Sequence, residues 1–167
     1  MTDQLSAAMA AVREQLGRPV TRPLGPVSER TAQRFAIATS DDSQVYFDRD
    51  AARDAGYPDL PVPPLYLSSV REWGAGPAPE ELQPDGTTTT DVGLPTGVPV
   101  RVLGGGQTLA FADEIVVGVP VTAEFTVTDV RRRPGTAGDL LVVEVRRTYT
   151  DVDGRTLLDC TESRVLR

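Results

Sequence analysis

Apolar residues near the start of the chain recur at the spacing of a helix. Between Gln4 and Leu16 they stand three or four positions apart, at Leu5, Met9, Val12 and Leu16. This spacing places them on one face and predicts an amphipathic helix, which Gly17 would end in a left-handed conformation. Because only one face is apolar, we expect the helix to pack across the domain or against a partner.

Two further helices are predicted before residue 57. Ser28 can cap the first of them. The apolar face of that helix would hold Ala32, Phe35 and Thr39. Asp48 can cap the second, Arg49 to Ala55, with Gly56 as the left-handed residue after it. We therefore interpret Asp48 as a helix cap in preference to a catalytic residue.

The middle of the chain predicts one buried helix and then a long connection. Prolines exclude a helix over residues 57–64, because each one withholds an amide donor and forces its predecessor toward extended geometry. We expect a central buried helix from Leu65 to Trp73, with Leu67, Val70 and Trp73 facing inward. Residues 74–99 are rich in Gly, Pro and Thr and lack periodicity, so we predict a flexible or lid loop there.

From residue 100 onward the apolar pattern changes to an alternation of period two, which predicts strands. One long strand is indicated by Val121, Ala123, Phe125 and Val127, and another by Leu141, Val143, Val145 and Arg147. The run from Asp151 to Gly154 predicts a tight turn into a last strand, Arg155 to Leu166. Helices first and an antiparallel meander last predict an α+β hot-dog fold, in which a long curled sheet wraps around a central helix.

Length and charge limit the possible functions. The 167 residues fit a single domain, residues 1–167, which can bury a core without disulfides or metals. A net charge of −7 opposes binding to nucleic acid. The sequence has neither a basic and apolar leader nor an apolar run of about 20 residues, so we expect a cytoplasmic protein without membrane contact. The single cysteine, Cys160, lies in an alternating apolar run and is interpreted as a buried structural thiol.

The stretch from Ala38 to Pro64 reads ATSDDSQVYFDRDAARDAGYPDLPVPP and holds the most informative motif of the chain. It resembles the active-site segment of MaoC-like (R)-specific enoyl-thioester hydratases, an Asp-x-Asn-Pro-x-His-x-Asp pattern followed by a short Ala-rich helix. On that pattern Asp41 takes the place of the catalytic aspartate and Tyr46 that of the histidine. The whole chain contains no histidine. The resemblance therefore implies the family's fold without half of its acid and base pair.

A second motif, Leu103-Gly-Gly-Gly-Gln107, resembles the His-Gly-Gly-Gln of the same family, with Gly104 in the place of the histidine. We expect a strand from Thr108 to Ile115 after it. Three groups, Ser40-Asp-Asp, Tyr46-Phe47 and Ala52 to Tyr57, are similar to the FAS1-like dehydratase N-terminal type. Within that type they most resemble the non-catalytic subunits of heterodimeric (3R)-hydroxyacyl-thioester dehydratases. The resemblance implies a partner subunit that carries the Asp and the His, while this subunit shapes the acyl channel.

The resemblance and the residue types together define the candidate site residues. Asp41 and Tyr46 stand at the family's catalytic positions, although a tyrosine with a pKa of about 10 is a poor base at neutral pH. Asp41 can instead hydrogen-bond the bend before the next helix. The candidate substrate-binding residues are Tyr57, Pro63, Tyr66, Gly105, Gly106, Arg131 and Arg132.

Each substrate-binding candidate also has a structural interpretation. The aromatic residues can line an acyl tunnel or form simple core. The glycines can let the backbone approach an acyl chain or a neighbouring strand, but no helix follows them that would bind a phosphate. Arg131 and Arg132 can hold the phosphates of coenzyme A or the acidic surface of an acyl carrier protein, or form a solvated strand tip. Arg146 and Arg147, on a neighbouring strand, have the same two interpretations.

Three functions remain open from the sequence. The leading hypothesis is a hot-dog subunit of an (R)-specific enoyl-thioester hydratase or 3-hydroxyacyl-thioester dehydratase, which lacks the histidine and shapes the acyl site beside a catalytic partner. The alternatives are a non-catalytic acyl-thioester binding module, and a self-sufficient lyase, cyclase or isomerase of natural-product biosynthesis that uses Asp41 and Tyr46. We expect no cofactor or metal, because the substrate would be carried on coenzyme A or acyl carrier protein. The expected partner is a hot-dog subunit with Asp and His, or a second copy of this chain.

Overall fold

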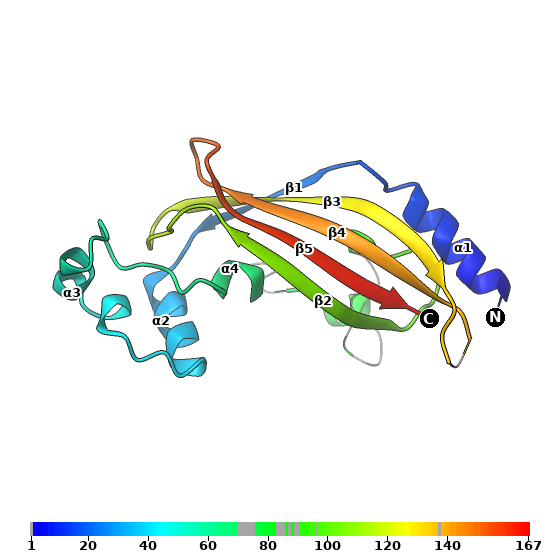
Figure 1. Ribbon diagram of the computed structural model, residues 1–167, viewed down its shortest axis with the longest axis horizontal. Coiled ribbons are helices and arrows are strands. Elements are labelled where there is room, and N and C mark those ends of the chain that lie inside the picture. The colour runs from blue at the N-terminus through cyan, green and yellow to red at the C-terminus, as the bar shows by residue number, and fades with distance from the viewer. Residues whose placement is uncertain are drawn as a thin grey trace.

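A curled antiparallel sheet forms the body of the molecule, with helices beyond both of its ends (Figure 1). The computed structural model describes residues 2–69, 76–82, 86, 88, 91–95, 97–136 and 138–167. Its five strands lie in the order β1-β3-β4-β5-β2, and all neighbours are antiparallel. The strands are β1 (Val20–Pro26), β2 (Val102–Phe111), β3 (Pro120–Arg133), β4 (Leu140–Thr150) and β5 (Thr156–Leu166). The α+β hot-dog fold predicted from the sequence is confirmed.

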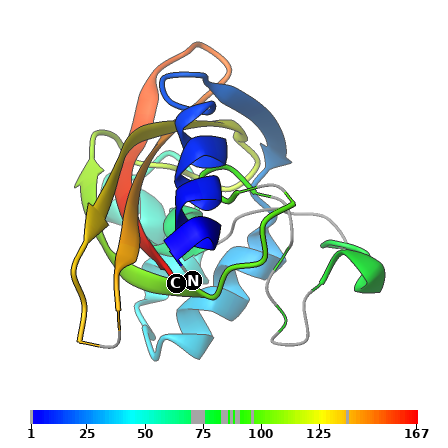
Figure 2. The same ribbon diagram turned by 90° about the vertical axis from the view of Figure 1, so that its right-hand side faces the viewer.

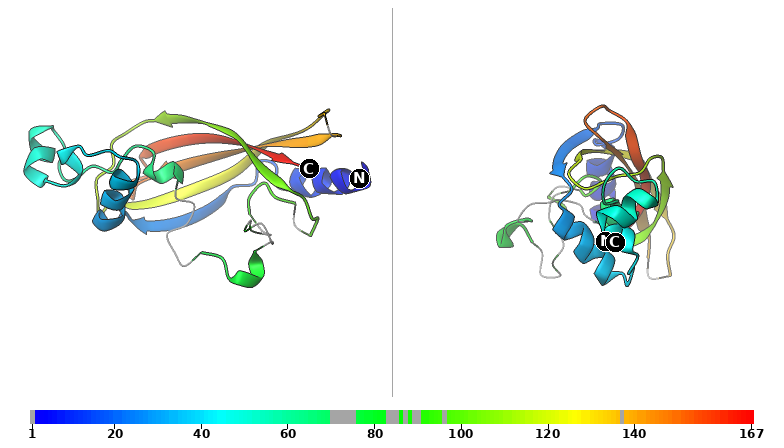
Figure 3. Two further views of the ribbon diagram at one scale, coloured as in Figure 1. Left: turned by 90° about the horizontal axis from the view of Figure 1, so that it is seen from below. Right: turned by 90° about the vertical axis from the view of Figure 1, so that its left-hand side faces the viewer.

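The helices are short, and one of them, Tyr66–Ser69, is buried against the inner face of the sheet, where the Ser68 carbonyl accepts a hydrogen bond from Arg147 at 3.5 Å. They are α1 (Thr2–Arg13), α2 (Glu29–Ala38), η1 (Gln44–Tyr46), α3 (Arg49–Asp54), α4 (Tyr66–Ser69) and η2 (Pro79–Glu81). Seen from one end, the sheet curls and α1 lies at the open end of the curl (Figure 2). Seen from below, α2 and α3 lie beyond one end of the strands and α1 lies toward the other (Figure 3). In the described part of the chain, no helix is long and apolar enough to cross a membrane.

The core lies against the inner face of the curled sheet. Residues that pair across antiparallel strands share a face, so the alternation in β3, β4 and β5 points one set of side chains inward. Val127 pairs with Val145, for example, and both are fully buried. The predicted apolar face of α1 contributes Leu5 and Val12 to this core.

The predicted helices agree with the structure in position and differ in detail. Asp48 caps α3 as predicted, because its carboxylate accepts hydrogen bonds from the backbone N–H of Asp50 at 2.7 Å and of Ala51 at 3.1 Å. Ser28 occupies the cap position of α2, but its side chain makes no capping hydrogen bond. Of the predicted central helix, α4 covers Tyr66–Ser69, in which Tyr66, Leu67 and Ser68 are buried. Val70 and Trp73 lie outside the described residues.

One strand was not predicted. Residues 18–26 are rich in proline and glycine and we predicted no element there, but Val20–Pro26 forms β1. This strand lies at the edge of the sheet and, among the described strands, pairs only with β3. An edge strand needs backbone N–H donors on one side only, so Pro23 and Pro26, which have none, are tolerated there. The ladder also shifts in register between Pro23 and Gly25.

Candidate functional site

The bend between α2 and α3 brings three candidate residues together. After α2, Ser40 takes a positive φ of 59°, and the Asp41 N–H donates to the Ala36 carbonyl at 2.9 Å. The chain then turns back, with the Asp41 carboxylate accepting a hydrogen bond from the Ser43 N–H at 3.3 Å. This contact is the bend-stabilising role considered for Asp41 from the sequence.

Tyr46 lies beside Asp41 at the end of η1. Partial burial raises the pKa of the Tyr46 phenol above its usual value, and the charge of Asp41 and its hydrogen bond with the phenol raise this pKa further. Tyr57 also raises the pKa of Tyr46, which places all three side chains in one neighbourhood. The phenol is therefore protonated at neutral pH. It can donate a hydrogen bond or a proton, but it cannot serve as a base there.

Pro63 and Tyr66 lie in the core rather than on an open surface. Tyr66 is 5% exposed, and its hydroxyl donates to the Thr31 hydroxyl at 2.9 Å. Its ring meets the Phe35 ring edge to face, with centroids 5.6 Å apart. The buried Pro63 accepts a hydrogen bond from the Tyr66 N–H through its carbonyl, at 2.9 Å. These contacts join α4 to α2.

Gly105 and Gly106 form a bulge in the edge strand β2. We predicted a strand only from residue 108, but β2 begins at Val102 and runs through the glycines to Phe111. The register against β5 shifts between Gly104 and Gly106. A Cβ at Gly105 would lie 2.7 Å from the Ser163 Oγ, and Gly106 has a φ of +126°. Close strand approach thus explains these glycines.

Arg131 and Arg132 are already paired with acidic side chains. Arg131 forms ion pairs with Asp129, at 2.7 Å, and with Glu144. Arg132 pairs with Asp139 at 2.8 Å. Both arginines stand near the end of β3, at the end of the sheet opposite to α3 (Figure 1). The structure therefore brings Asp41, Tyr46 and Tyr57 together, but it places the β2 glycines and these arginines elsewhere.

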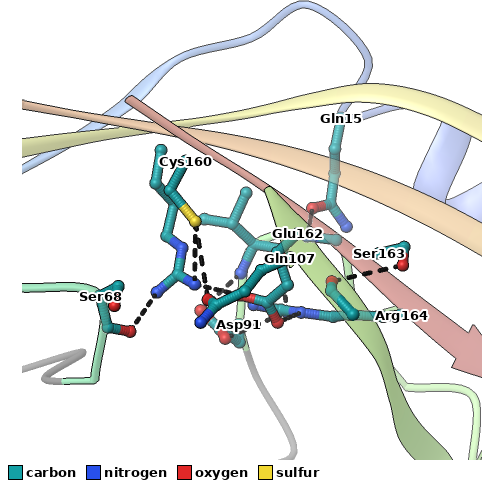
Figure 4. A network of polar contacts seen from close by, with 12 residues as sticks. Gln15, Ser68, Asp91, Gln107, Cys160, Glu162, Ser163 and Arg164 are labelled. Atoms are coloured by element: carbon teal, nitrogen blue, oxygen red, sulfur yellow. Dashed lines mark hydrogen bonds and ion pairs between the residues drawn. The ribbon is translucent and has the colours of Figure 1, made fainter. Parts of the chain in front are cut away.

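Sequence reasoning missed a polar network on the inner face of the sheet (Figure 4). We call Arg147, Glu162, Arg164 and Asp91 the inner network. Glu162 binds both arginines, with its Oε2 2.6 Å from the Arg147 Nη2 and its Oε1 accepting from the Arg164 Nε at 2.8 Å. Each arginine residue is 2% exposed. Burial of Arg147 therefore excludes both interpretations considered for it from the sequence, the carrier contact and the solvated strand position, whereas Arg146 is exposed and pairs with Asp159.

The inner network holds the segment of residues 91–95 against the sheet. The Arg164 Nη1 donates to the Val92 carbonyl at 2.7 Å and lies 3.2 Å from the Asp91 carboxylate. Gln15 adds two hydrogen bonds, to the Leu94 carbonyl at 2.8 Å and from the Gly93 N–H at 2.9 Å. This part of the predicted flexible or lid loop is therefore packed, with residues 92–95 buried.

The thiol of Cys160 lies against the inner network. It is 3.6 Å from the Arg147 Nη2 and donates a weak hydrogen bond to the Gln107 Oε1 at 3.8 Å. Burial raises the pKa of the Cys160 thiol, so it stays protonated and unreactive at neutral pH. The predicted buried structural thiol is confirmed. Among the described residues, no group of three or more Cys, Asp or Glu side chains is arranged to hold a metal ion.

Comparisons with known sequences point to one family. The model of the family described as "FAS1-like, dehydratase domain region" matches residues 14–160. The UPF0336 protein of Thermobifida fusca is 30% identical over 139 residues, which cover 81% of this chain and 82% of that protein. A UPF0336 protein of Streptomyces avermitilis is 27% identical over 161 residues, which cover 95% and 97% of the two chains.

Comparisons with solved structures support the same fold. The ChsH1-ChsH2 complex from Mycobacterium tuberculosis matches with a TM-score of 0.73 and 17% identity, over 98% of this chain and 90% of that chain. The C-terminally truncated HadBC (3R-hydroxyacyl-ACP dehydratase) complex from the same organism matches with a TM-score of 0.65 and 18% identity, over 90% and 96%. The R-hydratase PhaJ1 from Pseudomonas aeruginosa matches with a TM-score of 0.64 and 16% identity, over 95% and 84%.

Proposed function

Because the chain belongs to the FAS1-like dehydratase region family, we propose that it is a subunit of an (R)-specific enoyl-thioester hydratase or 3-hydroxyacyl-thioester dehydratase. It acts with a second hot-dog subunit that carries the catalytic Asp and His. The observation that carries this proposal is that a chain of this family has no histidine. Its own role is to shape the site for an acyl group carried on coenzyme A or an acyl carrier protein.

The chemistry explains why a partner is required. Dehydration of a 3-hydroxyacyl thioester needs a base for the C2 proton and an acid for the C3 hydroxyl. In this chain the histidine's position is held by Tyr46, whose raised pKa keeps it protonated. The Asp41 carboxylate beside it already accepts hydrogen bonds from the Ser43 N–H and from the phenol. The phenol can supply a proton, and the hydrogen-bonded carboxylate is a weaker base than the histidine that this chain lacks.

The free edge of the sheet offers a surface for the partner. β2 pairs with β5 on one side and with no other strand in the part of the chain that the structure describes. The opposite edge, β1, contains Pro23 and Pro26, whose missing donors discourage further strand pairing. β2 contains no proline, and Phe111 near its end is 53% exposed. Two structural neighbours are complexes of two different chains, which supports a hot-dog partner.

The decisive experiment compares the isolated chain with the assembled complex. Hydration of a trans-2-enoyl thioester is measured as the loss of absorbance of the conjugated thioester. The purified chain should show negligible hydration in this assay. Mixing it with a hot-dog subunit that carries Asp and His should restore turnover, and replacing that subunit's histidine should abolish it again. Full turnover by the isolated chain would contradict the proposal.

A second function is favoured by the contact between Asp41 and Tyr46. The phenol stays protonated and hydrogen-bonded to the carboxylate, which is the arrangement of a general acid. A self-sufficient lyase, cyclase or isomerase that needs only proton donation can use it. In that case the isolated chain is active, and both Asp41→Asn and Tyr46→Phe abolish the activity while leaving the melting temperature nearly unchanged.

A further inference from the structure

The outward face of α2 carries two charges and one apolar side chain that nothing in the described structure covers. Arg30, Arg34 and Ile37 stand at positions i, i+4 and i+7, so they lie on one face of this helix. All three are exposed, Ile37 by 67%. The opposite face of α2 packs into the molecule through the buried Ala32 and Ala36. We call Arg30, Arg34 and Ile37 the α2 stripe.

The two arginines of the α2 stripe have no carboxylate partner. Neither Arg30 nor Arg34 forms an ion pair among the described residues. The adjacent Glu29 is already engaged, because its carboxylate lies 2.6 Å from the Arg49 Nη2 and accepts a hydrogen bond from the Gln33 Nε2 at 3.3 Å. Both guanidinium groups of the stripe are therefore exposed and available to carboxylates of another molecule.

The α2 stripe lies beside the candidate site. Gln33, on the neighbouring face of α2, donates a hydrogen bond to the Tyr46 carbonyl at 3.3 Å, and the bend that holds Asp41 follows α2 directly. Both α2 and α3 lie beyond the end of the strands (Figure 3). The other described arginines without an ion pair belong to α1, to the connection after it or to strand ends on the side of α1 (Figure 1): Arg13, Arg18, Arg101, Arg133 and Arg167.

The charge around the α2 stripe limits which partner fits it. The chain has a net charge of −7, so most of its surface repels an acidic protein. Asp42 and Asp54 are exposed and also have no ion pair among the described residues, but neither belongs to α2. An acidic partner is therefore attracted by position rather than by net charge. It has to place carboxylates on Arg30 and Arg34, which are one helical turn apart and suited to bidentate pairing.

We propose that the α2 stripe docks an acyl carrier protein, with acidic side chains of the carrier on Arg30 and Arg34 and an apolar one on Ile37. A convex helix face suits a protein surface, whereas a small molecule such as coenzyme A binds in a concave site. Docking there brings the carried acyl group to the end of the molecule that holds Asp41 and Tyr46. The inference rests on the proposed function and decides between the two carriers which that function leaves open.

Titration of the isolated chain with the fatty-acid acyl carrier protein of the host organism tests the docking directly. The carrier should bind, and binding should weaken as salt is added, because the contact is exposed. Arg30→Glu combined with Arg34→Glu should weaken binding about tenfold or more, and Ile37→Ser about threefold. The control, Arg101→Glu combined with Arg133→Glu, makes the same change in net charge on the side of α1 and should leave binding nearly unchanged. Absence of binding, or equal weakening by the two double variants, would overturn the proposal.

Turnover by the complex with the catalytic subunit separates this proposal from the proposed function. The Arg30 and Arg34 double variant should raise the KM for a crotonyl group on the carrier protein about tenfold or more and leave kcat/KM for crotonyl coenzyme A unchanged. Equal losses with both substrates, or failure of the variant to assemble in light scattering, would show that the α2 stripe serves the catalytic subunit instead and would overturn the docking. Lack of turnover with either substrate would contradict the proposed function, and the titration would still decide the docking.

Discussion

At the scale of single residues, Gly93 combines a left-handed backbone with a close contact that a side chain would make. It has a φ of +82°, and a Cβ there would lie 2.7 Å from the Val145 Cγ2 and 3.3 Å from the Val143 Cγ1. Gly93→Ala should lower the free energy of unfolding by about 1–3 kcal/mol, because overpacking adds to the backbone strain. Urea unfolding measures this loss.

Gly97 provides the matched control for Gly93. Its φ of +75° is similar, but a Cβ there would meet nothing within 4 Å. Gly97→Ala therefore carries the backbone strain without the clash. Equal destabilisation by the two substitutions would contradict the close packing of residues 91–95 on the sheet.

The phenol of Tyr46 should titrate above the usual pKa of a tyrosine, about 10. Burial is the largest cause, so Asp41→Asn should lower the pKa of Tyr46 only in part, and Asp42→Asn, an exposed neighbour, should change it less. Ultraviolet titration of the phenolates, with Tyr46→Phe to assign the signal, measures the shift.

The raised pKa of Tyr46 also makes the stability of the fold depend on pH. Because this pKa is higher in the folded chain than in the unfolded one, the stabilisation that is present below a pH of about 10 is lost as the pH rises through the raised pKa. A Tyr46 pKa at or below 10 would contradict this contact.

At the scale of elements, Gln15 joins the end of the first helical segment to the inner face of the sheet. Its amide donates to the Leu94 carbonyl and accepts from the Gly93 N–H. Gln15→Ala leaves two partly buried backbone groups without partners, so it should destabilise the fold by about 1–3 kcal/mol. Gln15→Glu keeps the acceptor and should lose less. Hydrogen exchange at Gly93 measures the local effect, and Glu14→Ala at an exposed neighbour should leave this exchange unchanged.

The sequence correctly predicted the elements that depend on residues close together in the chain. Asp48 and the residues after it contain all that a helix cap needs, and the alternation in residues 141–147 already placed Arg147 on the apolar face. The partners of Arg147 and Arg164 could not be found in the same way. Glu162 lies on another strand, and Asp91 lies in a segment without periodicity. Residue type therefore suggested a surface role for Arg147, whereas distant contacts bury it.

The same limit applies to the candidate site. The motif from Ala38 to Pro64 correctly placed Asp41 near Tyr46, because both belong to one short bend. It could not show that Tyr66 is buried against Phe35 or that Arg131 is paired with Asp129, since these contacts depend on how helices and strands pack. Residues close in sequence were grouped correctly, and residues far apart were not.

At the scale of the whole molecule, the free edge of β2 should decide assembly. Phe111 is 53% exposed near the end of this strand, and a charge there would have to be desolvated when a partner strand is added. Phe111→Lys should weaken the dimer or heterodimer at least tenfold, as measured by light scattering over a dilution series. Val152→Lys introduces the same charge at a residue that is 70% exposed in the β4–β5 turn, outside the edge strands, and should leave assembly intact. Equal effects of the two substitutions, or a wild-type chain that stays monomeric with its partner present, would exclude β2 as the docking edge and would leave β1, with its two prolines, as the only other edge of this sheet.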